Sequence, residues 1–304
     1  MREFAEAKLE LLGIPKTILS RYDEPHRHYH NWDHIEDLLR QCSKNIADNL
    51  FLAIIFHDII YDPLSKTNEL DSADYFFGFM KDKEVYDAIM ATATHKPTNE
   101  LGCKLCSIDL RIIHSHLKQF MDFEHKIFKE YQFVDYKQYV EARVEILHDL
   151  GTNPINIAYV ANRKPKIAVY AGSFNPIHKG HLNIIEKAER IFDKVIIAIG
   201  NNPEKNNGTA QLDIKKLGYR QVDYYDGLLT DYLDGLGYEV TLIRGLRNAN
   251  DLQYETTQLR FLQDMKPDIN VVNIICDKEY DHISSSAIRM LMKVDNDKAQ
   301  EYLI

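Results

Sequence analysis

The chain of 304 residues has few cysteines, one tryptophan and no long apolar run. Its cysteines, Cys42, Cys103, Cys106 and Cys276, are too few and too scattered for a disulfide scaffold, so we expect reduced thiols. No apolar run approaches the roughly 18 residues that span a bilayer, and residues 1–6 lack the apolar core of a signal peptide. These absences predict a cytoplasmic protein with no membrane partner.

Positive charge is also scarce, because 37 Lys and Arg stand against 46 Asp and Glu, a formal net charge of −9. A protein that coats nucleic acid needs a positive field, so we expect small-molecule substrates and no nucleic-acid partner. Homo-oligomerisation stays open. At about 100–200 residues per domain, the length predicts two domains.

The hydrophobic pattern changes near residues 150–165, where Gly, Asn and Pro punctuate the chain. Before this point the apolar residues follow helical spacing, and after it short runs rich in β-formers alternate with helices. We therefore predict an all-α domain over 1–162 and an α/β domain with a doubly wound, Rossmann-like parallel sheet over 163–304. The expected helices cover 33–42, 49–61, 72–80, 83–94, 136–150 and 180–192, and the expected strands cover 166–170, 195–200, 221–225, 239–244 and 269–276.

The first expected strand runs into the string G-S-F-N-P-I-H-K-G-H at residues 172–181. Ligands bind at the loop that leaves the carboxyl end of a parallel strand. Gly172 permits close approach to the backbone, and the helix that Gly180 opens can offer its free amides to phosphate. His178 and His181 are three residues apart and face one spot, where imidazoles can donate hydrogen bonds as charge develops in a displacement.

This string resembles the signature of the nucleotidyltransferase superfamily, which includes adenylyl- and cytidylyltransferases. Further segments resemble the phosphopantetheine adenylyltransferases: I-R-G-L-R-N-A-N-D-L-Q-Y-E at 243–255 is similar to their R-G-L-R…D-F-E-Y-E, G-L-L at 227–229 to their G-L-L, and I-S-S-S-A-I-R at 283–289 to their I-S-S-S-x-x-R. The segment 201–205 follows the second strand as it does in that family. The resemblance covers about residues 166–293.

Each motif in this half has a physical interpretation. Arg244 and Arg247 leave a strand end together, where forked guanidinium groups can clamp phosphates. Serines at a helix start favour an anion. The resemblance implies catalytic roles for His178, His181, Lys205 and Arg247. It implies nucleotide-binding roles for Gly172, Ser173, Phe174, His181, Arg244, Arg247, Glu255, Ser284, Ser285 and Ser286.

The resemblance also implies a reaction, the transfer of AMP from ATP with Mg²⁺ to 4'-phosphopantetheine, giving dephospho-CoA and pyrophosphate. The stretch between Lys205 and Gly227 is shorter than in the family and borders the acceptor pocket there, so the acceptor stays open. Nicotinamide mononucleotide is an alternative acceptor, although the R-G-L-R and G-L-L strings argue against it. A regulatory module that binds nucleotide without turnover is a second alternative, against which the intact His178 and His181 argue.

Polar residues interrupt apolar segments in the N-terminal half. His34 ends R-H-Y-H-N-W-D-H, the pair His57 and Asp58 lies in F-H-D-I-I-Y-D, and Asp109 lies in S-I-D-L. A buried His-Asp pair is costly unless it binds something. Imidazole and carboxylate are natural ligands of divalent cations.

This ordered set resembles the HD superfamily of metal-dependent phosphohydrolases. The strings N-E…S-A at 68–73 and A-T-H at 93–95 extend the likeness, to a subfamily of predicted HD phosphohydrolases, over about residues 20–150. The resemblance implies one divalent metal of unknown identity, bound by His34, His57, Asp58 and Asp109, with His95 and Glu69 as candidates of second rank. The whole chain is thus expected to be a bifunctional enzyme whose hydrolase substrate the sequence does not give.

Overall fold

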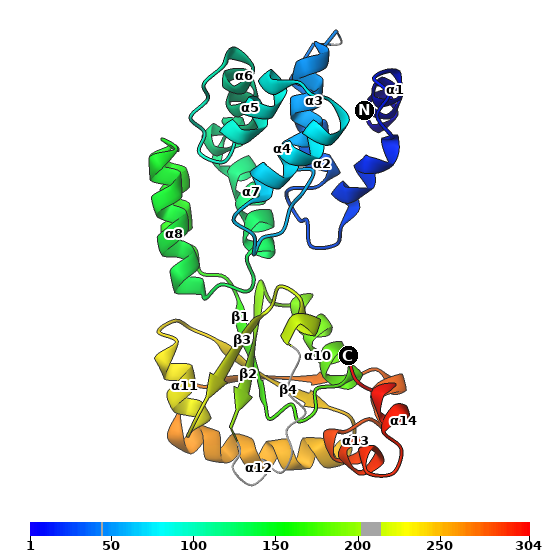
Figure 1. The fold of residues 1–304 in the computed structure, drawn as a ribbon. Coiled ribbons are helices and arrows are strands. Elements are labelled where there is room, and N and C mark those ends of the chain that lie inside the picture. Colours follow the sequence, from blue (N-terminus) through cyan, green and yellow to red (C-terminus); the bar gives the residue numbers. More distant parts are fainter. Residues whose placement is uncertain (44, 202–213) are drawn as a thin grey trace. The chain divides into compact units, whose positions relative to one another are not determined.

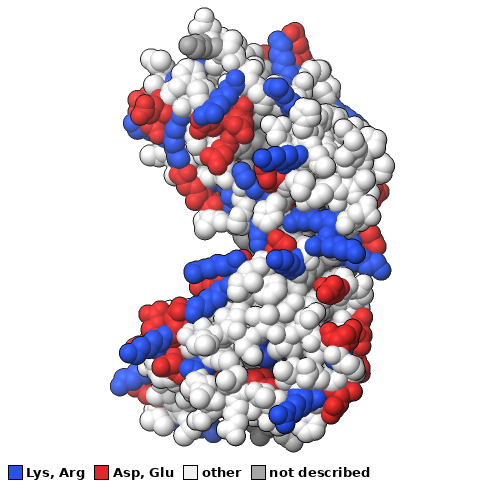
Figure 2. All heavy atoms as spheres, turned by 180° about the vertical axis from the view of Figure 1, so that it is seen from behind, with Lys and Arg blue, Asp and Glu red and all other residues white. Residues whose placement is uncertain are grey.

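The computed structural model describes residues 1–43, 45–201 and 214–304 (Figure 1). The chain divides into two compact units, each described here by itself. The first comprises residues 1–131 and 136–163, and the second comprises residues 132–135 and 164–304. None of the helices in the described part of the chain is long and apolar enough to cross a bilayer. Acidic and basic side chains are interspersed over the face of each unit that Figure 2 shows.

The first unit is helical, as predicted. Helix α3 is its most apolar element, and residues Phe51 to Phe56 are all buried in a core to which α1 to α6 contribute. A second cluster joins α7, α8 and α9. The elements are α1 (Arg2–Leu11), η1 (Lys16–Asp23), α2 (Trp32–Arg40), α3 (Asp48–Phe56), α4 (Asn68–Phe79), α5 (Lys83–Ala91), α6 (Glu100–Asp109), η2 (Leu110–His114), α7 (Leu117–Glu130), α8 (Tyr136–Asp149) and α9 (Pro154–Asn162).

Helix α3 is shorter than the helix expected over 49–61, and its early end matters for the site. Phe56 is its last residue, and His57 and Asp58 lie in the turn that follows. The buried guanidinium of Arg27 accounts for this end, because it donates to the carbonyls of Asp58 at 2.6 Å and Ile59 at 3.1 Å. Carbonyls that bond to Arg27 satisfy their hydrogen-bonding need outside a helix.

The second unit contains a five-stranded, fully parallel sheet in the order β3-β2-β1-β4-β5, which confirms the predicted Rossmann-like class. The chain runs outward from β1 to β3 and then returns to the other side of β1 with β4. The crevice between β1 and β4 is thus the point where the strand order reverses, and ligands bind there in such sheets. The strands are β1 (Ile167–Gly172), β2 (Lys194–Gly200), β3 (Gln221–Tyr225), β4 (Thr241–Leu246) and β5 (Asn270–Ile275).

Helices connect the strands and cover the sheet (Figure 1). Helix α10 follows β1 and packs its buried residues Ile184, Ile185 and Ala188 into the core of this unit. The elements are α10 (Lys179–Glu189), η4 (Ile214–Leu217), α11 (Leu229–Gly235), α12 (Ala249–Met265), η5 (Lys278–Tyr280), α13 (Ser285–Met292) and α14 (Asn296–Gln300).

A short strap, residues 132–135, lies between α7 and α8 in the sequence but belongs to the second unit. The side chain of Lys194, the first residue of β2, is fully buried there. Its ammonium group donates to the carbonyl of Gln132 and, at 2.9 Å, to that of Val134. The hydroxyl of Tyr238 donates to Asp135 at 2.8 Å. The strap therefore supplies the acceptors for a buried positive charge in the second unit.

Candidate functional sites

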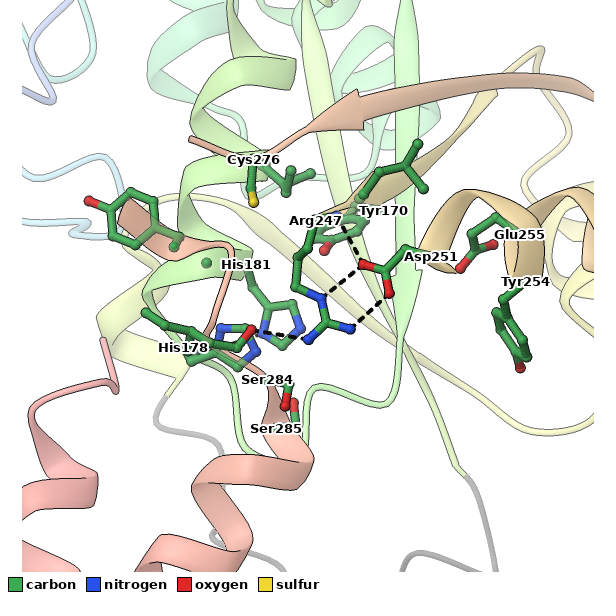
Figure 3. Close-up of a pocket in the computed structure, with 16 residues that line it drawn as sticks. Tyr170, His178, His181, Arg247, Asp251, Tyr254, Glu255, Cys276, Ser284 and Ser285 are labelled. Carbon is green, nitrogen blue, oxygen red and sulfur yellow. Dashed lines mark hydrogen bonds and ion pairs between the residues drawn. The ribbon is translucent and has the colours of Figure 1, made fainter. Parts of the chain in front are cut away.

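A cavity of about 290 Å³ lies at the carboxyl ends of β1 and β4 in the second unit (Figure 3). The crevice at the strand-order reversal is thus open to a ligand. Its lining residues are Tyr170, His178, Gly180, His181, Ile184, Gly245, Leu246, Arg247, Asp251, Tyr254, Glu255, Cys276, Tyr280, Ile283, Ser284 and Ser285.

Two stacked imidazoles form one wall of the cavity. The rings of His178 and His181 lie with centroids 3.6 Å apart and planes 25° apart. His178 precedes the first turn of α10, and its backbone N–H donates to Nδ1 of His181 at 3.2 Å. Because Nδ1 of His181 accepts this bond, the neutral ring carries its hydrogen on Nε2. His181 can therefore donate from Nε2.

The ring of Phe174 packs against the histidine pair through His181. The backbone of this residue adopts a left-handed conformation with φ of 43°, and its ring meets that of His181 edge-on with centroids 5.0 Å apart. The same ring covers Gly172, where a Cβ atom would come within 3.2 Å of it. Gly172 is therefore the residue that lets Phe174 reach this place.

Both imidazoles are held neutral. Burial, together with the smaller effect of the charge of Arg247, lowers the pKa of His178 to about 4. Burial also lowers the pKa of His181 well below its usual value, with contributions from His178 and Arg247. Nδ1 of His178 is buried and has no hydrogen-bond partner among the described residues. Two neutral rings beside an arginine form a wall that suits an anion.

Carboxylates from α12 hold both motif arginines. Asp251 accepts from Nε and Nη2 of Arg247, each at 2.9 Å, and from its backbone N–H at 2.9 Å (Figure 3). Nε of Arg244 lies 3.2 Å from Oε2 of Glu255. Burial raises the pKa of Glu255, and Arg244 opposes that rise. The guanidinium groups are thus oriented before any ligand arrives.

The expected site residues of this half fall into groups. Six of them line the cavity: His178, His181, Arg247, Glu255, Ser284 and Ser285. Phe174 packs against His181 and Gly172, and Ser173 follows β1. Arg244 and Glu255 border a smaller cavity of about 20 Å³. The Ser286 hydroxyl accepts from Arg289 at 3.1 Å. Lys205 lies outside the described residues.

The serines serve the start of α13. Ser284 caps this helix by accepting from the N–H of Ala287 at 3.1 Å, and the Ser285 hydroxyl donates to the carbonyl of Pro176 at 2.9 Å. Sequence reasoning did not assign a role to Tyr170, Asp251, Tyr254, Cys276 or Tyr280, which also line the cavity. Asp251 carries a signal that could have found it, since it follows Arg247 by four residues at a helix start.

Comparisons with known proteins agree with this geometry. The cytidylyltransferase-like family model matches residues 169–291. The phosphopantetheine adenylyltransferase of Streptococcus pneumoniae (strain CGSP14) is 38% identical over 144 residues, which is 44% of this chain and 88% of that protein. Its counterpart in Geotalea daltonii is 40% identical over 132 residues, or 41% of this chain and 81% of that protein. The phosphopantetheine adenylyltransferase of Alkaliphilus metalliredigens is 32% identical over 143 residues, which is 44% of this chain and 90% of that protein.

The chain belongs to the phosphopantetheine adenylyltransferase family. The family model lies wholly within the second unit, which is therefore a nucleotidyltransferase unit of this family. A solved lipopolysaccharide core biosynthesis protein from Thermoplasma volcanium GSS1 aligns with a TM-score of 0.27 and 13% identity, over 38% of this chain and 98% of that one.

The first unit of this adenylyltransferase-family chain holds a cluster of imidazole and carboxylate groups. Nε2 of His34 and Nε2 of His57 lie 3.3 Å apart. Oδ2 of Asp58 is 2.9 Å from the His57 nitrogen and 3.5 Å from the His34 nitrogen. Oδ1 of Asp109 is 3.3 Å from His34 and 3.8 Å from His57. The structure thus brings together the four expected ligands from α2, the turn after α3 and the end of α6.

Neighbouring groups fix the orientation of these side chains. Nδ1 of His57 lies 2.9 Å from the carbonyl of Ile54, so this nitrogen donates and Nε2 is left for a ligand. Arg27 holds the carbonyl of His30 at 3.0 Å as well as that of Asp58. The segments that carry His34 and His57-Asp58 are therefore tied to one buried guanidinium.

The protonation of the cluster is that of a site built for positive charge. Burial would lower the pKa of His34, but the hydrogen bonds that its ring donates to Asp109 and Asp58 outweigh burial and raise this pKa to about 9. Burial likewise opposes ionisation of Asp58, yet His57 and His34 lower its pKa well below its usual value. One ligand atom from each of His34, His57 and Asp58 lies within 4.8 Å of the others. This donor set fits a divalent cation.

The two candidates of second rank differ. Nε2 of His95 is 3.5 Å from Oδ2 of Asp109, and its backbone is left-handed with φ of 52°. Glu69 lies in the first turn of α4 and makes no hydrogen bond or ion pair to the four ligands within the described ranges. His95 therefore borders the cluster, and Glu69 does not join it.

Proposed function

We propose that the second unit transfers AMP from ATP to 4'-phosphopantetheine, which gives dephospho-CoA and pyrophosphate. The observation that carries the proposal is the wall of two neutral imidazoles beside Arg247, in a cavity at the carboxyl ends of β1 and β4. This chain covers 81–90% of the length of the three relatives. All three are phosphopantetheine adenylyltransferases, and 4'-phosphopantetheine is proposed as the acceptor on that ground.

The reaction needs positioning and charge stabilisation and no covalent intermediate. An oxygen of the acceptor phosphate attacks the α-phosphorus, the bond to the bridging oxygen breaks, and pyrophosphate leaves with the electron pair. Nε2–H of His181 donates to a phosphate oxygen whose charge grows in the transition state. The forked guanidinium of Arg247 binds a second phosphate group. Mg²⁺ bound to the nucleotide would neutralise part of the triphosphate charge.

Pyrophosphate release tests the proposal and separates its rivals. Purified protein is given ATP and Mg²⁺ with 4'-phosphopantetheine in one arm and nicotinamide mononucleotide in another. Release with the first acceptor alone supports the proposal, and release with the second alone assigns the alternative acceptor. Tight ATP binding without release in either arm identifies a regulatory module without turnover.

We propose that the first unit is a metal-dependent phosphohydrolase in which His34, His57, Asp58 and Asp109 hold one divalent cation. The convergence of ligand atoms of His34, His57 and Asp58, with Oδ1 of Asp109 3.3 Å from the His34 nitrogen, supports it. A bound cation would lower the pKa of a coordinated water and polarise a phosphate ester. The hydrogen bond from Nδ1 of His57 to the carbonyl of Ile54 fixes the orientation of the His57 ring. The hydrogen bond from Arg27 to the carbonyl of Asp58 holds the turn that carries Asp58.

Metal analysis tests this second function directly. The protein is dialysed with Mn²⁺ and then freed of loosely bound ions, and its manganese content is measured. About one ion per chain supports the proposal, and hydrolysis of phosphate monoesters should cease when a chelator removes the ion. Protein that retains no metal after this treatment contradicts it.

A further inference from the structure

A set of hydrogen bonds between α10 and the segment after β5 has no place in the functions described so far. Asn183 lies on α10 two residues after His181, and it is 9% exposed. Its Oδ1 accepts from the backbone N–H of Asp277 at 3.0 Å, and its Nδ2 donates to Oδ2 of Asp277 at 2.7 Å. The two bonds fix the amide orientation, because the reversed amide would set a donor against an N–H and an acceptor against a carboxylate.

Lys187, one turn further along α10, adds two more bonds to this set. Its ammonium group donates to Oδ1 of Asp277 at 2.5 Å and to the carbonyl of Ile275 at 2.8 Å. Hydrogen bonds from Lys187 and Asn183 lower the pKa of Asp277, so its carboxyl group is ionised at neutral pH. Helix α10 thus holds both oxygens of this carboxylate and one backbone group on each side of Cys276.

The segment held in this way is part of the wall of the nucleotide cavity. Cys276 is 8% exposed and lines the cavity, into which Figure 3 shows its sulfur. Further along the segment, Tyr280, Ile283, Ser284 and Ser285 also line it. His181 of α10 lines the same cavity. The space between the imidazole pair and the segment 276–285 therefore depends on how that segment is joined to α10.

We propose that Asn183 and Asp277 are positioning residues that hold the segment 276–285 in place for the nucleotide. The proposal rests on the adenylyl transfer proposed for the second unit. Neither side chain is among the described residues that line the cavity, so both act through the segment. A wall that is in place before ATP arrives binds it at a lower cost in ordering. Such a wall serves ground state and transition state alike, so its loss should raise KM for ATP and leave kcat nearly unchanged.

A charge swap tests the proposal in the full chain. Asn183→Asp keeps the acceptor for the N–H of residue 277 but sets a second carboxylate against that of Asp277. The affinity for ATP with Mg²⁺, measured by calorimetry, should fall about 10-fold, the order that one charge-assisted hydrogen bond contributes. Adding Asp277→Asn to this variant restores a donor opposite an acceptor. The double variant should return to within about 3-fold of the wild type, because the two positions are coupled.

A matched control separates this role from a general loss of stability. Glu189 also lies on α10, and its carboxylate accepts from Nε of Arg220 at 2.5 Å and from Nη2 at 2.9 Å. That ion pair joins α10 to the residues before β3, and neither partner is among the described residues that line the cavity. Glu189→Gln should lower the melting temperature and leave both KM for ATP and the affinity for ATP unchanged.

The reactivity of Cys276 gives a second readout that needs no turnover. A buried thiol reacts with iodoacetamide only when its surroundings open. Timed alkylation followed by peptide mass spectrometry separates Cys276 from the other three cysteines. Cys276 should react faster in Asn183→Asp, and its rate should return to the wild-type value in the double variant. Glu189→Gln should match the wild type.

Asp277→Ala is a second variant that should fold, because the Asp277 side chain is 51% exposed. It should also weaken ATP binding and speed the alkylation of Cys276. Wild-type values in both variants, a double variant no better than Asn183→Asp, or a fall in kcat at unchanged KM would overturn the positioning role. If the wild type binds ATP but releases no pyrophosphate with either acceptor, adenylyl transfer fails, and the affinities and alkylation rates still decide the role of Asn183 and Asp277.

Discussion

The carboxylate of Asp251 holds the guanidinium of Arg247 through two parallel hydrogen bonds, Oδ2 to Nε and Oδ1 to Nη2, each 2.9 Å long (Figure 3). The pair joins Arg247, which precedes α12, to Asp251 in the first turn of this helix, and Asn248 caps the helix. The bonds fix the plane of the guanidinium, and they leave Nη1 of Arg247 directed at the carbonyl of Ile283 at 3.4 Å. An arginine set in this way is oriented for phosphate at little entropic cost.

We therefore expect Asp251→Asn and Arg247→Lys each to reduce adenylyl transfer by about 10-fold to 100-fold. The first variant breaks one of the parallel bonds and the second keeps the charge but loses the fork, and charge-assisted hydrogen bonds contribute about 1.5–3 kcal/mol. Asp234→Asn, which removes an exposed partner of Lys266, is the matched control and should leave the rate unchanged. Pyrophosphate release measures all three. Wild-type rates in both test variants would rule out the fork.

The histidine pair leads to a second prediction. His181→Ala should cut adenylyl transfer by about 10²-fold or more, because it removes a preorganised donor. The binding of ATP should weaken far less than turnover, since Arg247 and α10 remain. Turnover by pyrophosphate release and ATP affinity by calorimetry separate the two effects. Near-normal turnover would remove His181 from the mechanism.

The pKa of His178 predicts acid sensitivity. An unfolded histidine has a pKa near 6.5, whereas that of folded His178 is lowered to about 4. The unfolded chain thus binds more protons between these values, so the free energy of unfolding falls as the pH falls from 6.5 towards 4. His181 acts in the same direction.

His178→Gln should consequently lose less stability than the wild type between pH 7 and pH 5. Urea unfolding at the two pH values gives each loss, and the difference between proteins isolates His178 from other titrating groups. Equal losses in both proteins would mean that His178 is protonated in the folded chain at pH 5.

Much of the fold could be predicted from the sequence, and so could the residues that meet in the two candidate sites. The strings around His178 and Arg247 carry their own context of strand and helix, and the polar residues His34 and Asp109 stand out in apolar segments. The end of α3 was not predictable, since it depends on Arg27, which lies 31 residues from Asp58 in sequence. The spacing of apolar residues within 49–61 does not indicate a hydrogen bond to a residue so far away in the sequence.

The hydrogen bonds of Glu130 and those of the strap also join residues that are far apart in the sequence. Glu130 meets Tyr29 and His30 across 101 and 100 residues, and Lys194 meets Val134 across 60. Nothing in the spacing around Lys194 distinguishes it from an exposed lysine at the start of a strand. Sequence reasoning thus finds motifs and misses the buried groups that support them.

The strap leads to a prediction about separating the units. A fragment of residues 164–304 keeps the sheet but lacks 132–135, so the buried ammonium of Lys194 has lost two carbonyl acceptors. Removing the partners of a buried charge costs about 3–5 kcal/mol. We expect this fragment to be far less stable than the same unit in the full chain.

Lys194→Met tests the cause, because methionine fills similar space without the charge. In the fragment it should recover stability, and in the full chain it should cost stability or change little. Thermal unfolding of the four proteins provides the comparison. If the fragment is as stable as the full chain with Lys194 intact, the strap is not what satisfies this lysine.

The metal cluster gives the last prediction. His57 and Asp58 are neighbours in the turn after α3, yet Nε2 of one and Oδ2 of the other lie 2.9 Å apart, and His34 and Asp109 come to them from α2 and α6. Asp58→Ala should therefore remove both the bound metal and the hydrolysis of phosphate esters. It should leave adenylyl transfer intact, because the nucleotide cavity is built from the other unit.

Asp122→Ala, an exposed aspartate of α7, controls for the general loss of a carboxylate and should keep its metal. Elemental analysis, ester hydrolysis and pyrophosphate release are measured on the same preparations. A folded Asp58→Ala protein with full metal content would place the ion elsewhere. Loss of adenylyl transfer together with hydrolysis would mean that the turn after α3 supports both activities, because the substitution touches no residue of the nucleotide cavity.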